Sequence, residues 1–118
     1  MNWPGPLATV REVEIETRRA ADGPAHRTTI WPVVEDEEVY VRSLRGSAGR
    51  WYREVTGNPE AIVHVEDEAI PVRAVSAVDA DSVERASAGF RRKYADSPHM
   101  GSMIASDILD TTLRLDPR

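Results

Sequence analysis

Residues 27–46, RTTIWPVVEDEEVYVRSLRG, decide how this chain can fold. Two runs rich in β-branched and aromatic residues, 28–34 and 39–44, flank the acidic segment 35–38, which predicts two strands joined by a solvated hairpin tip. Pro32 cannot donate a ladder hydrogen bond, so the first strand needs a bulge or an unpaired edge at that residue. Because hairpin-linked strands are typical of antiparallel sheets, the stretch argues against a parallel α/β fold.

The segments on either side of this hairpin extend the same pattern. Further strands are predicted at 13–17, 61–65, 69–78 and 111–115, and helices at 47–56, 81–95 and 97–106. Asp81 is the expected N-cap of the second helix, with Glu84 completing a capping box, and its apolar stripe is Val83, Ala86, Phe90 and Tyr94. The chain is thus predicted to be mainly β (α+β), as an antiparallel sheet or small barrel.

Composition narrows the class of protein. A length of 118 residues suits one domain, residues 1–118, in which we expect 1–7 to be a flexible N-terminal segment. The absence of cysteine excludes disulfides and thiolate chemistry. A net charge of −5 argues against a general nucleic-acid or membrane-surface protein. Without a signal peptide or a long apolar run, a cytoplasmic location is expected.

Candidate catalytic and metal-binding groups are sparse. The three histidines, His26, His64 and His99, are dispersed and lack the spacing of metal ligands, so no metal site is predicted. Ser47 lacks the G-x-S-x-G context of a nucleophile. The acidic segments 35–38 and 66–68 are predicted to be solvated turns rather than acid–base pairs. No catalytic residue is therefore assigned.

The segment 42–53 is a positive island in an acidic chain. It holds four arginines and no acid, together with two glycines and two serines, at the passage from a strand into a helix. Arginine forks, hydroxyls and helix-start N–H groups all bind oxyanions, so the segment is a candidate phosphate-binding corner. The alternative interpretation is a solvated arginine-rich loop in which Trp51 anchors the core.

The order of elements and several motifs resemble the pyridoxamine 5'-phosphate oxidase-like (PNPOx-like) split β-barrel superfamily, which includes FMN-binding proteins and F420-dependent reductases. Within it, the chain is most similar to the bacterial DUF2255 family over about residues 8–117. The motifs that carry this resemblance are W-P-V, VRS-RG, WYR, the N-P turn, FRRKYA and the terminal TTLRL. The resemblance implies a six-stranded antiparallel split β-barrel with two or three short helices.

The resemblance also implies a function and a site. It implies a homodimer with cofactor clefts between the barrels, FMN or F420 as cofactor, and an oxidoreductase of unknown substrate. The acidic charge balance and the lack of a long apolar run predict no nucleic-acid or membrane partner. By position, the cofactor-binding residues are Arg27, Thr28, Thr29, Trp31, Arg42, Ser43, Arg45, Arg50 and Trp51, with Ile30 near the cofactor rings. The paired Arg/Lys pattern of pyridoxamine-phosphate oxidases is missing, which disfavours pyridoxal-phosphate synthesis. The alternative is a non-catalytic split-barrel module that binds another small phosphorylated or anionic ligand.

Overall fold

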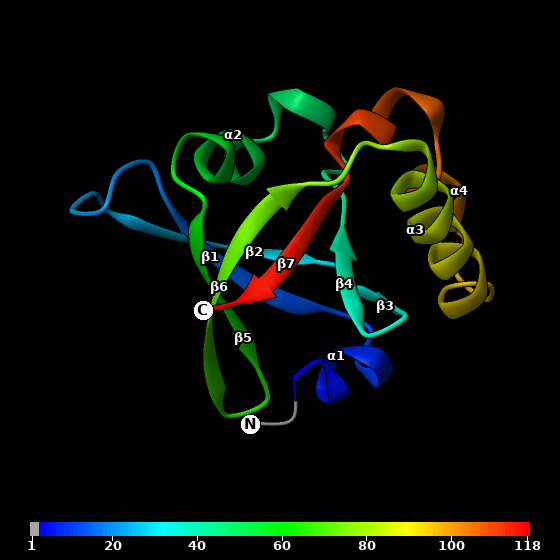
Figure 1. The fold of residues 1–118 in the computed structure, drawn as a ribbon, viewed down its shortest axis with the longest axis horizontal. Coiled ribbons are helices and arrows are strands. Elements are labelled where there is room, and N and C mark those ends of the chain that lie inside the picture. The colour runs from blue at the N-terminus through cyan, green and yellow to red at the C-terminus, as the bar shows by residue number, and fades with distance from the viewer. Residues whose placement is uncertain (1–2) are drawn as a thin grey trace.

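Seven strands form one antiparallel sheet in the computed structural model, which describes residues 3–118. The strands are β1 (Val13–Arg18), β2 (Ala25–Ile30), β3 (Val33–Glu35), β4 (Glu38–Val41), β5 (Glu60–Val65), β6 (Glu68–Ser76) and β7 (Leu113–Pro117). Their spatial order is β2-β1-β5-β6-β7-β4-β3, and the sheet curls into a half-barrel (Figure 1). The structure confirms the predicted mainly β (α+β), antiparallel split-barrel fold.

Pro32 explains why the sheet has seven strands where six were predicted. The predicted strand 28–34 ends at Ile30, and a separate strand begins at Val33. Ile30 pairs with Val13 of β1, whereas Val33 pairs with Tyr40 of β4, so the chain changes sheet partner across the two residues between them. Because proline has no N–H for the ladder, it stands where the chain leaves one edge of the sheet for the other.

The β3–β4 hairpin has the predicted position but a less solvated tip. Asp36 and Glu37 adopt positive φ angles of 53° and 67°, which indicates a tight two-residue turn. Both are exposed, but the carboxylate of Glu35 is largely buried and lies 2.6 Å from Nη1 of Arg92. The acidic segment therefore also contacts the long helix that covers this hairpin.

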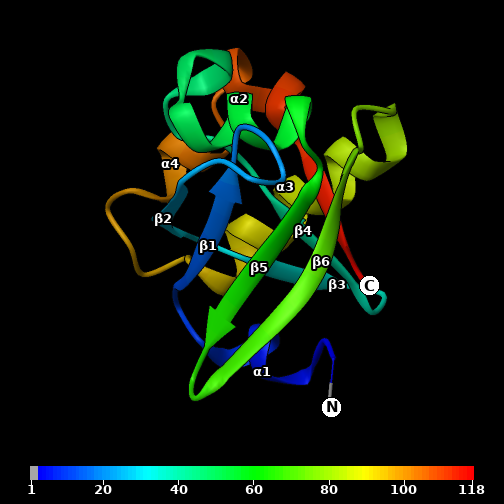
Figure 2. The same ribbon diagram turned by 90° about the vertical axis from the view of Figure 1, so that its left-hand side faces the viewer.

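Four α-helices and two short 3-10 helices complete the fold. They are α1 (Gly5–Thr9), η1 (Gly46–Ala48), α2 (Arg50–Gly57), α3 (Ala80–Lys93), α4 (Met100–Met103) and η2 (Ser106–Thr111). Figure 2 shows β1, β5 and β6 next to one another, with α2 at one end of these strands and α1 at the other. None of the helices within residues 3–118 has the length and apolar character needed to cross a membrane.

Several helices differ from the sequence-based expectations. The predicted helix 47–56 is divided into η1 and α2 at Gly49, and of the predicted helix 97–106 only Met100–Met103 is α-helical. Helix α3 is capped by Asp79 and not by Asp81, because the Asp79 carboxylate accepts the N–H of Ser82, three residues further on. This bond holds the pKa of Asp79 below its ordinary value. Helix α1 overlaps the segment 1–7 that was expected to be flexible, and its Leu7 is buried. Residues 1 and 2 lie outside the described part of the chain.

The apolar side chains form two clusters. The larger one fills the inside of the curled sheet and includes Ile15, Val63 and Trp51. The smaller one lies between the β3–β4 hairpin and the helices α3 and α4, around Phe90 and Tyr94. The expected stripe of α3 is buried here except for Val83, which is only partly buried. The functional candidates lie between these two clusters.

Candidate functional site

A cavity of about 600 Å³ opens between β2, the loop after β4, the start of α2 and the segment around α4. It is lined by Thr28, Thr29, Ile30, Trp31, Arg42, Leu44, Arg45, Gly49, Arg50, Trp51, His99 and Met103. This volume lies inside the range of roughly 300–1,000 Å³ that is typical of small-molecule sites. The lining contains three arginines and no carboxylate, so the cavity is strongly electropositive.

Seven of the nine predicted cofactor-binding residues meet at this cavity: Thr28, Thr29, Trp31, Arg42, Arg45, Arg50 and Trp51. Ile30, expected near the rings, joins them. Leu44, Gly49, His99 and Met103 were not predicted as site residues. Leu44 and Gly49 adjoin predicted positions, but His99 and Met103 arrive from a distant segment that no local motif connects to the arginine island.

Arg27 and Ser43 do not line the cavity. Arg27 is exposed, and its Nε lies 3.5 Å from Oε1 of Glu14 on the neighbouring strand β1. Ser43 is buried, and its hydroxyl donates a 2.7 Å hydrogen bond to the carbonyl oxygen of Gly46. Its backbone N–H donates to Oγ1 of Thr111. Ser43 thus shapes the loop that presents the arginines.

Arg42 is buried, with 2% of its surface exposed. It donates from Nε to Thr112 Oγ1 (2.9 Å), from Nη1 to Ser87 Oγ (2.9 Å) and Met103 O (3.1 Å), and from Nη2 to Val83 O (2.9 Å). Burial, with a smaller contribution from the charge of Arg91, lowers the pKa of Arg42 to about 10, so it stays cationic at neutral pH. Its guanidinium joins β4 to α3, to α4 and to the residue before β7.

Arg45 and Arg50 differ from Arg42 in their exposure and in their lack of partners within the described residues. Both are exposed, and neither forms an ion pair or a side-chain hydrogen bond with any residue in the range 3–118. Arg50 begins helix α2, whose N-cap is Gly49 with no side-chain cap, so the first N–H groups of the helix are open to a ligand. Two unpaired guanidinium groups beside an uncapped helix N-terminus suit a phosphate or carboxylate.

An aromatic wall lies on another side of the cavity. Trp31 stacks on Tyr94, with ring centroids 4.4 Å apart and planes 18° apart. The Tyr94 hydroxyl lies 2.8 Å from the carbonyl oxygens of Pro32 and Arg11, and burial raises the pKa of this hydroxyl. Lys93 Nζ donates to the Pro32 carbonyl as well, and burial lowers its pKa to about 8. These bonds fix the backbone beside Trp31 and hence the ring that faces the cavity.

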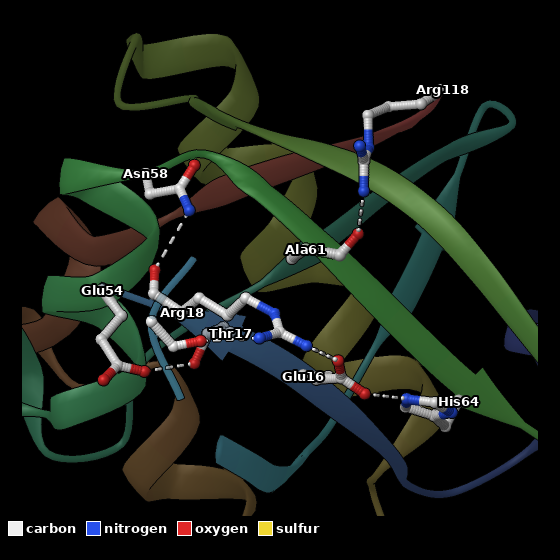
Figure 3. A network of polar contacts seen from close by, with 9 residues as sticks. Glu16, Thr17, Arg18, Glu54, Asn58, Ala61, His64 and Arg118 are labelled. Carbon is white, nitrogen blue, oxygen red and sulfur yellow. Dashed lines mark hydrogen bonds and ion pairs between the residues drawn. The ribbon is translucent and has the colours of Figure 1, made fainter. Parts of the chain in front are cut away.

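A polar network outside the cavity lining holds α2 in place (Figure 3). The Thr17 hydroxyl of β1 donates a 2.7 Å hydrogen bond to the buried carboxylate of Glu54 on α2, and Asn58 donates to the Arg18 carbonyl. On the other face of β1, Glu16 contacts His64 Nε2 at 2.8 Å, which holds the pKa of Glu16 below its ordinary value. The bonds from Glu54 and Asn58 attach α2 to the sheet and so position Arg50.

The donor set fits a planar ring that carries an anionic group. The exposed arginines and the helix start would hold the anion, while Trp31, Ile30 and Met103 offer an apolar surface for the ring. Within residues 3–118, no group of three or more histidine, aspartate or glutamate side chains is placed to hold a metal ion. The arginines and the apolar side chains of this lining can bind and orient such a ligand.

The curled antiparallel sheet, whose two edges are joined through Trp31 and Pro32, and the cavity beside that connection define a protein with a split-barrel-like fold. Residues 6–115 match the family described as "Uncharacterized protein conserved in bacteria (DUF2255)". The chain therefore belongs to the DUF2255 family, as its motifs predicted. Among curated proteins, none matches this chain.

Solved structures share the fold at low sequence identity. The conserved hypothetical protein Rv2991 from Mycobacterium tuberculosis is 16% identical with a TM-score of 0.74, over 97% of this chain and 77% of that one. An F420-H2 dependent reductase, FDR-A, is 18% identical with a TM-score of 0.69, over 90% and 94% of the two chains. The heme storage protein HutZ from Vibrio cholerae is 16% identical with a TM-score of 0.67, over 97% and 86%. The fold is thus shared by an F420-H2 dependent reductase and a heme storage protein.

Proposed function

We propose that the cavity binds FMN or F420 and that the protein is an oxidoreductase that uses this cofactor. The observation that carries the proposal is the pairing, in one cavity of about 600 Å³, of two unpaired arginines with an aromatic wall. The likeness to an F420-H2 dependent reductase supports it. The proposal also accounts for the scarcity of catalytic side chains, because such a cofactor supplies the hydride chemistry itself.

The residues of this chain would bind and orient the cofactor. Arg45 and Arg50 hold the phosphate together with the open N–H groups at the start of α2. Trp31, held by its stack on Tyr94, supports the ring and excludes water from one side of it.

We also propose that the protein acts as a homodimer with its cofactor clefts at the interface. A structural relative with a TM-score of 0.66 and 17% identity is a domain-swapped dimer. Leu44, on the cavity wall, is 59% exposed in the isolated chain. A partner subunit that closed the cavity would bury this side chain and shield the ring from water. Sedimentation equilibrium tests the oligomeric state directly, and a monomer at every concentration would contradict the dimer.

Cofactor titration tests the main proposal. Purified apo-protein is titrated with FMN and with F420 and followed by cofactor fluorescence. Arg50→Gln removes a charged contact worth about 1.5–3 kcal/mol, so we expect the dissociation constant to rise by about 10- to 150-fold. Arg53→Gln is the matched control, because Arg53 is exposed on the same helix but does not line the cavity. Its effect should stay within about twofold.

Two results would reject the cofactor proposal. One is the absence of binding of FMN and F420 at about 100 µM, a concentration well above the dissociation constant expected for a resident cofactor. The other is an equal loss of affinity in the two arginine variants, since that would reflect net charge and not a local contact. Either result would favour the alternative, a module that binds another small anionic ligand.

One such ligand, heme, is favoured by a specific observation. His99 lies on the cavity wall, and imidazole is a common axial ligand of heme iron, while Arg45 and Arg50 could pair with the heme carboxylates. The likeness to HutZ supports this second candidate. Hemin titration distinguishes it from the first: binding with a Soret shift that His99→Ala abolishes supports heme, whereas a weak complex unaffected by that change excludes His99 ligation.

A further inference from the structure

Arg42 contributes a buried positive charge to the cavity, and no carboxylate within residues 3–118 forms an ion pair with it. We propose that this charge makes the cavity selective for a ring that becomes negative on reduction, so that the reduced cofactor binds more tightly than the oxidised one. The inference rests on the proposed function, and it gives Arg42 a different role from the phosphate contact predicted from the sequence.

The four acceptors around Arg42 are all neutral oxygens. They belong to two hydroxyls and two backbone carbonyls, and no carboxylate in residues 3–118 forms an ion pair with this guanidinium. Hydrogen bonds of this kind satisfy the N–H groups but leave the net charge in place. Buried charges are normally paired with an opposite charge because desolvation is costly. An unpaired one therefore favours an anion in the adjoining cavity.

The position of Arg42 separates it from the two exposed arginines. Arg45 and Arg50 are solvated and face a phosphate in water, where charge is strongly screened. Arg42 is enclosed by protein: its guanidinium carbon lies 5.4 Å from the centre of the Phe90 ring, and its Nη1 donates to the carbonyl of Met103, a residue of the apolar lining. A charge in such surroundings acts at longer range on a neighbouring ring.

Arg42 also retains hydrogen-bonding capacity. A guanidinium has five N–H groups, and four of those of Arg42 are paired, so one N–H on Nη2 has no acceptor among the bonds formed within residues 3–118. A ring oxygen or nitrogen that gains negative charge on reduction is a suitable acceptor. The same group would then combine charge and a directed hydrogen bond.

The redox chemistry of the ring supplies the selectivity. Bound FMN would supply this chemistry: its oxidised isoalloxazine ring is neutral, and the addition of a hydride, two electrons with one proton, would leave that ring with one negative charge. A second proton from water would cancel that charge, so a neighbouring cation favours the singly protonated, anionic form. The hydride comes from the external reductant, and Arg42 neither gains nor loses a proton or an electron.

The test measures binding in both redox states without requiring turnover. Wild-type protein is titrated with oxidised FMN and, under anaerobic conditions with dithionite, with reduced FMN. We expect at least tenfold tighter binding of the reduced form, which equals a rise in midpoint potential of about 30 mV for a two-electron couple. Equal affinities for the two forms would overturn the inference while leaving the proposed function intact. Failure of FMN to bind in either state would overturn this inference, and failure of F420 to bind as well would reject the proposed function.

Three variants assign the effect to Arg42. Arg42→Gln removes the charge and should abolish the difference between the redox states, while Arg42→Lys keeps the charge and should retain most of it. Arg45→Gln should weaken both forms equally and leave the potential unchanged. Circular dichroism verifies folding, and if Arg42→Gln does not fold, the lysine variant and the wild-type potential decide the matter. A potential shift that follows Arg45 instead of Arg42 would overturn the inference.

Discussion

The contact between Gly49 and Ser43 provides the sharpest test of what holds the loop after β4, residues 42–49, in its shape. The backbone of Gly49 is ordinary extended chain, with φ −62° and ψ 136°, so its conformation would accept alanine. The space around Gly49 would not accept alanine, because an added Cβ would lie 2.6 Å from Oγ of Ser43. That hydroxyl is held by its bond to the Gly46 carbonyl and cannot rotate away without breaking it. We predict that Gly49→Ala destabilises the protein through this one contact.

The magnitude follows from separable contributions. Overpacking of this kind costs about 1–3 kcal/mol. Alanine is a poorer N-cap than glycine by roughly 1 kcal/mol, while the loss of unfolded-chain entropy stabilises by about 0.4–1 kcal/mol, so these two effects nearly cancel. Ser43→Ala alone costs about 0.5–1.5 kcal/mol for its hydrogen bond. The double variant should therefore be more stable than the sum of the single changes by about 1–3 kcal/mol.

Urea unfolding of the four proteins, followed by tryptophan fluorescence and circular dichroism, measures this coupling energy. Gly57→Ala is the matched control, because Gly57 lies on the same helix and an added Cβ there meets nothing within 4 Å. Its coupling to Ser43→Ala should be zero within error. A Gly49–Ser43 coupling below about 0.5 kcal/mol, the usual error of additivity, would refute the assignment of Ser43 as the residue that shapes the loop.

Two further predictions concern helix α3. Burial lowers the pKa of Lys93 from 10.5 to about 8, so between these pH values the unfolded chain binds a proton that the folded chain has released. The free energy of unfolding should therefore rise from pH 8 towards pH 10. Urea unfolding at pH 7.5 and at pH 9.5 measures this rise, which should be smaller in Lys93→Met than in the wild-type protein. An equal rise in the two proteins would contradict the prediction. Phe90→Ala should cost about 3–5 kcal/mol because the side chain is fully buried, and a loss below about 1 kcal/mol in thermal unfolding would contradict its place in the core.

Patterns among neighbouring residues were sufficient to predict most of the fold and one side of the candidate site. The period-two alternation of strands such as 13–17 and the helical stripe through Phe90 depend on neighbouring residues, and both were confirmed. The part of the cavity formed by 28–31 and 42–51 could be predicted because those segments follow one another along the chain. Contact of these residues with a cofactor stays a prediction.

What the sequence could not provide depends on contacts between distant segments. His99 and Met103 reach the cavity through the packing of α4, and no spacing in the sequence links that segment to residues 42–50. Likewise, Asp79 and Asp81 both precede the helical stripe of α3. Only the position of the Ser82 N–H, three residues after Asp79, decides which of them caps the helix.

The positive island, residues 42–53, shows most clearly that the fold gives different surroundings to arginines that lie close together in the sequence. Its four cations lie within twelve residues of sequence, but Arg42, the residue directly after β4, is buried, while Arg45 and Arg50 are exposed where the loop and the start of α2 meet the cavity. Arg53 is exposed away from the cavity lining. The local charge of +4 therefore overstates the charge offered to a phosphate. Two arginines are available for that contact, and we propose that the third, buried one acts on the ring of the ligand, because the surrounding protein screens its charge least.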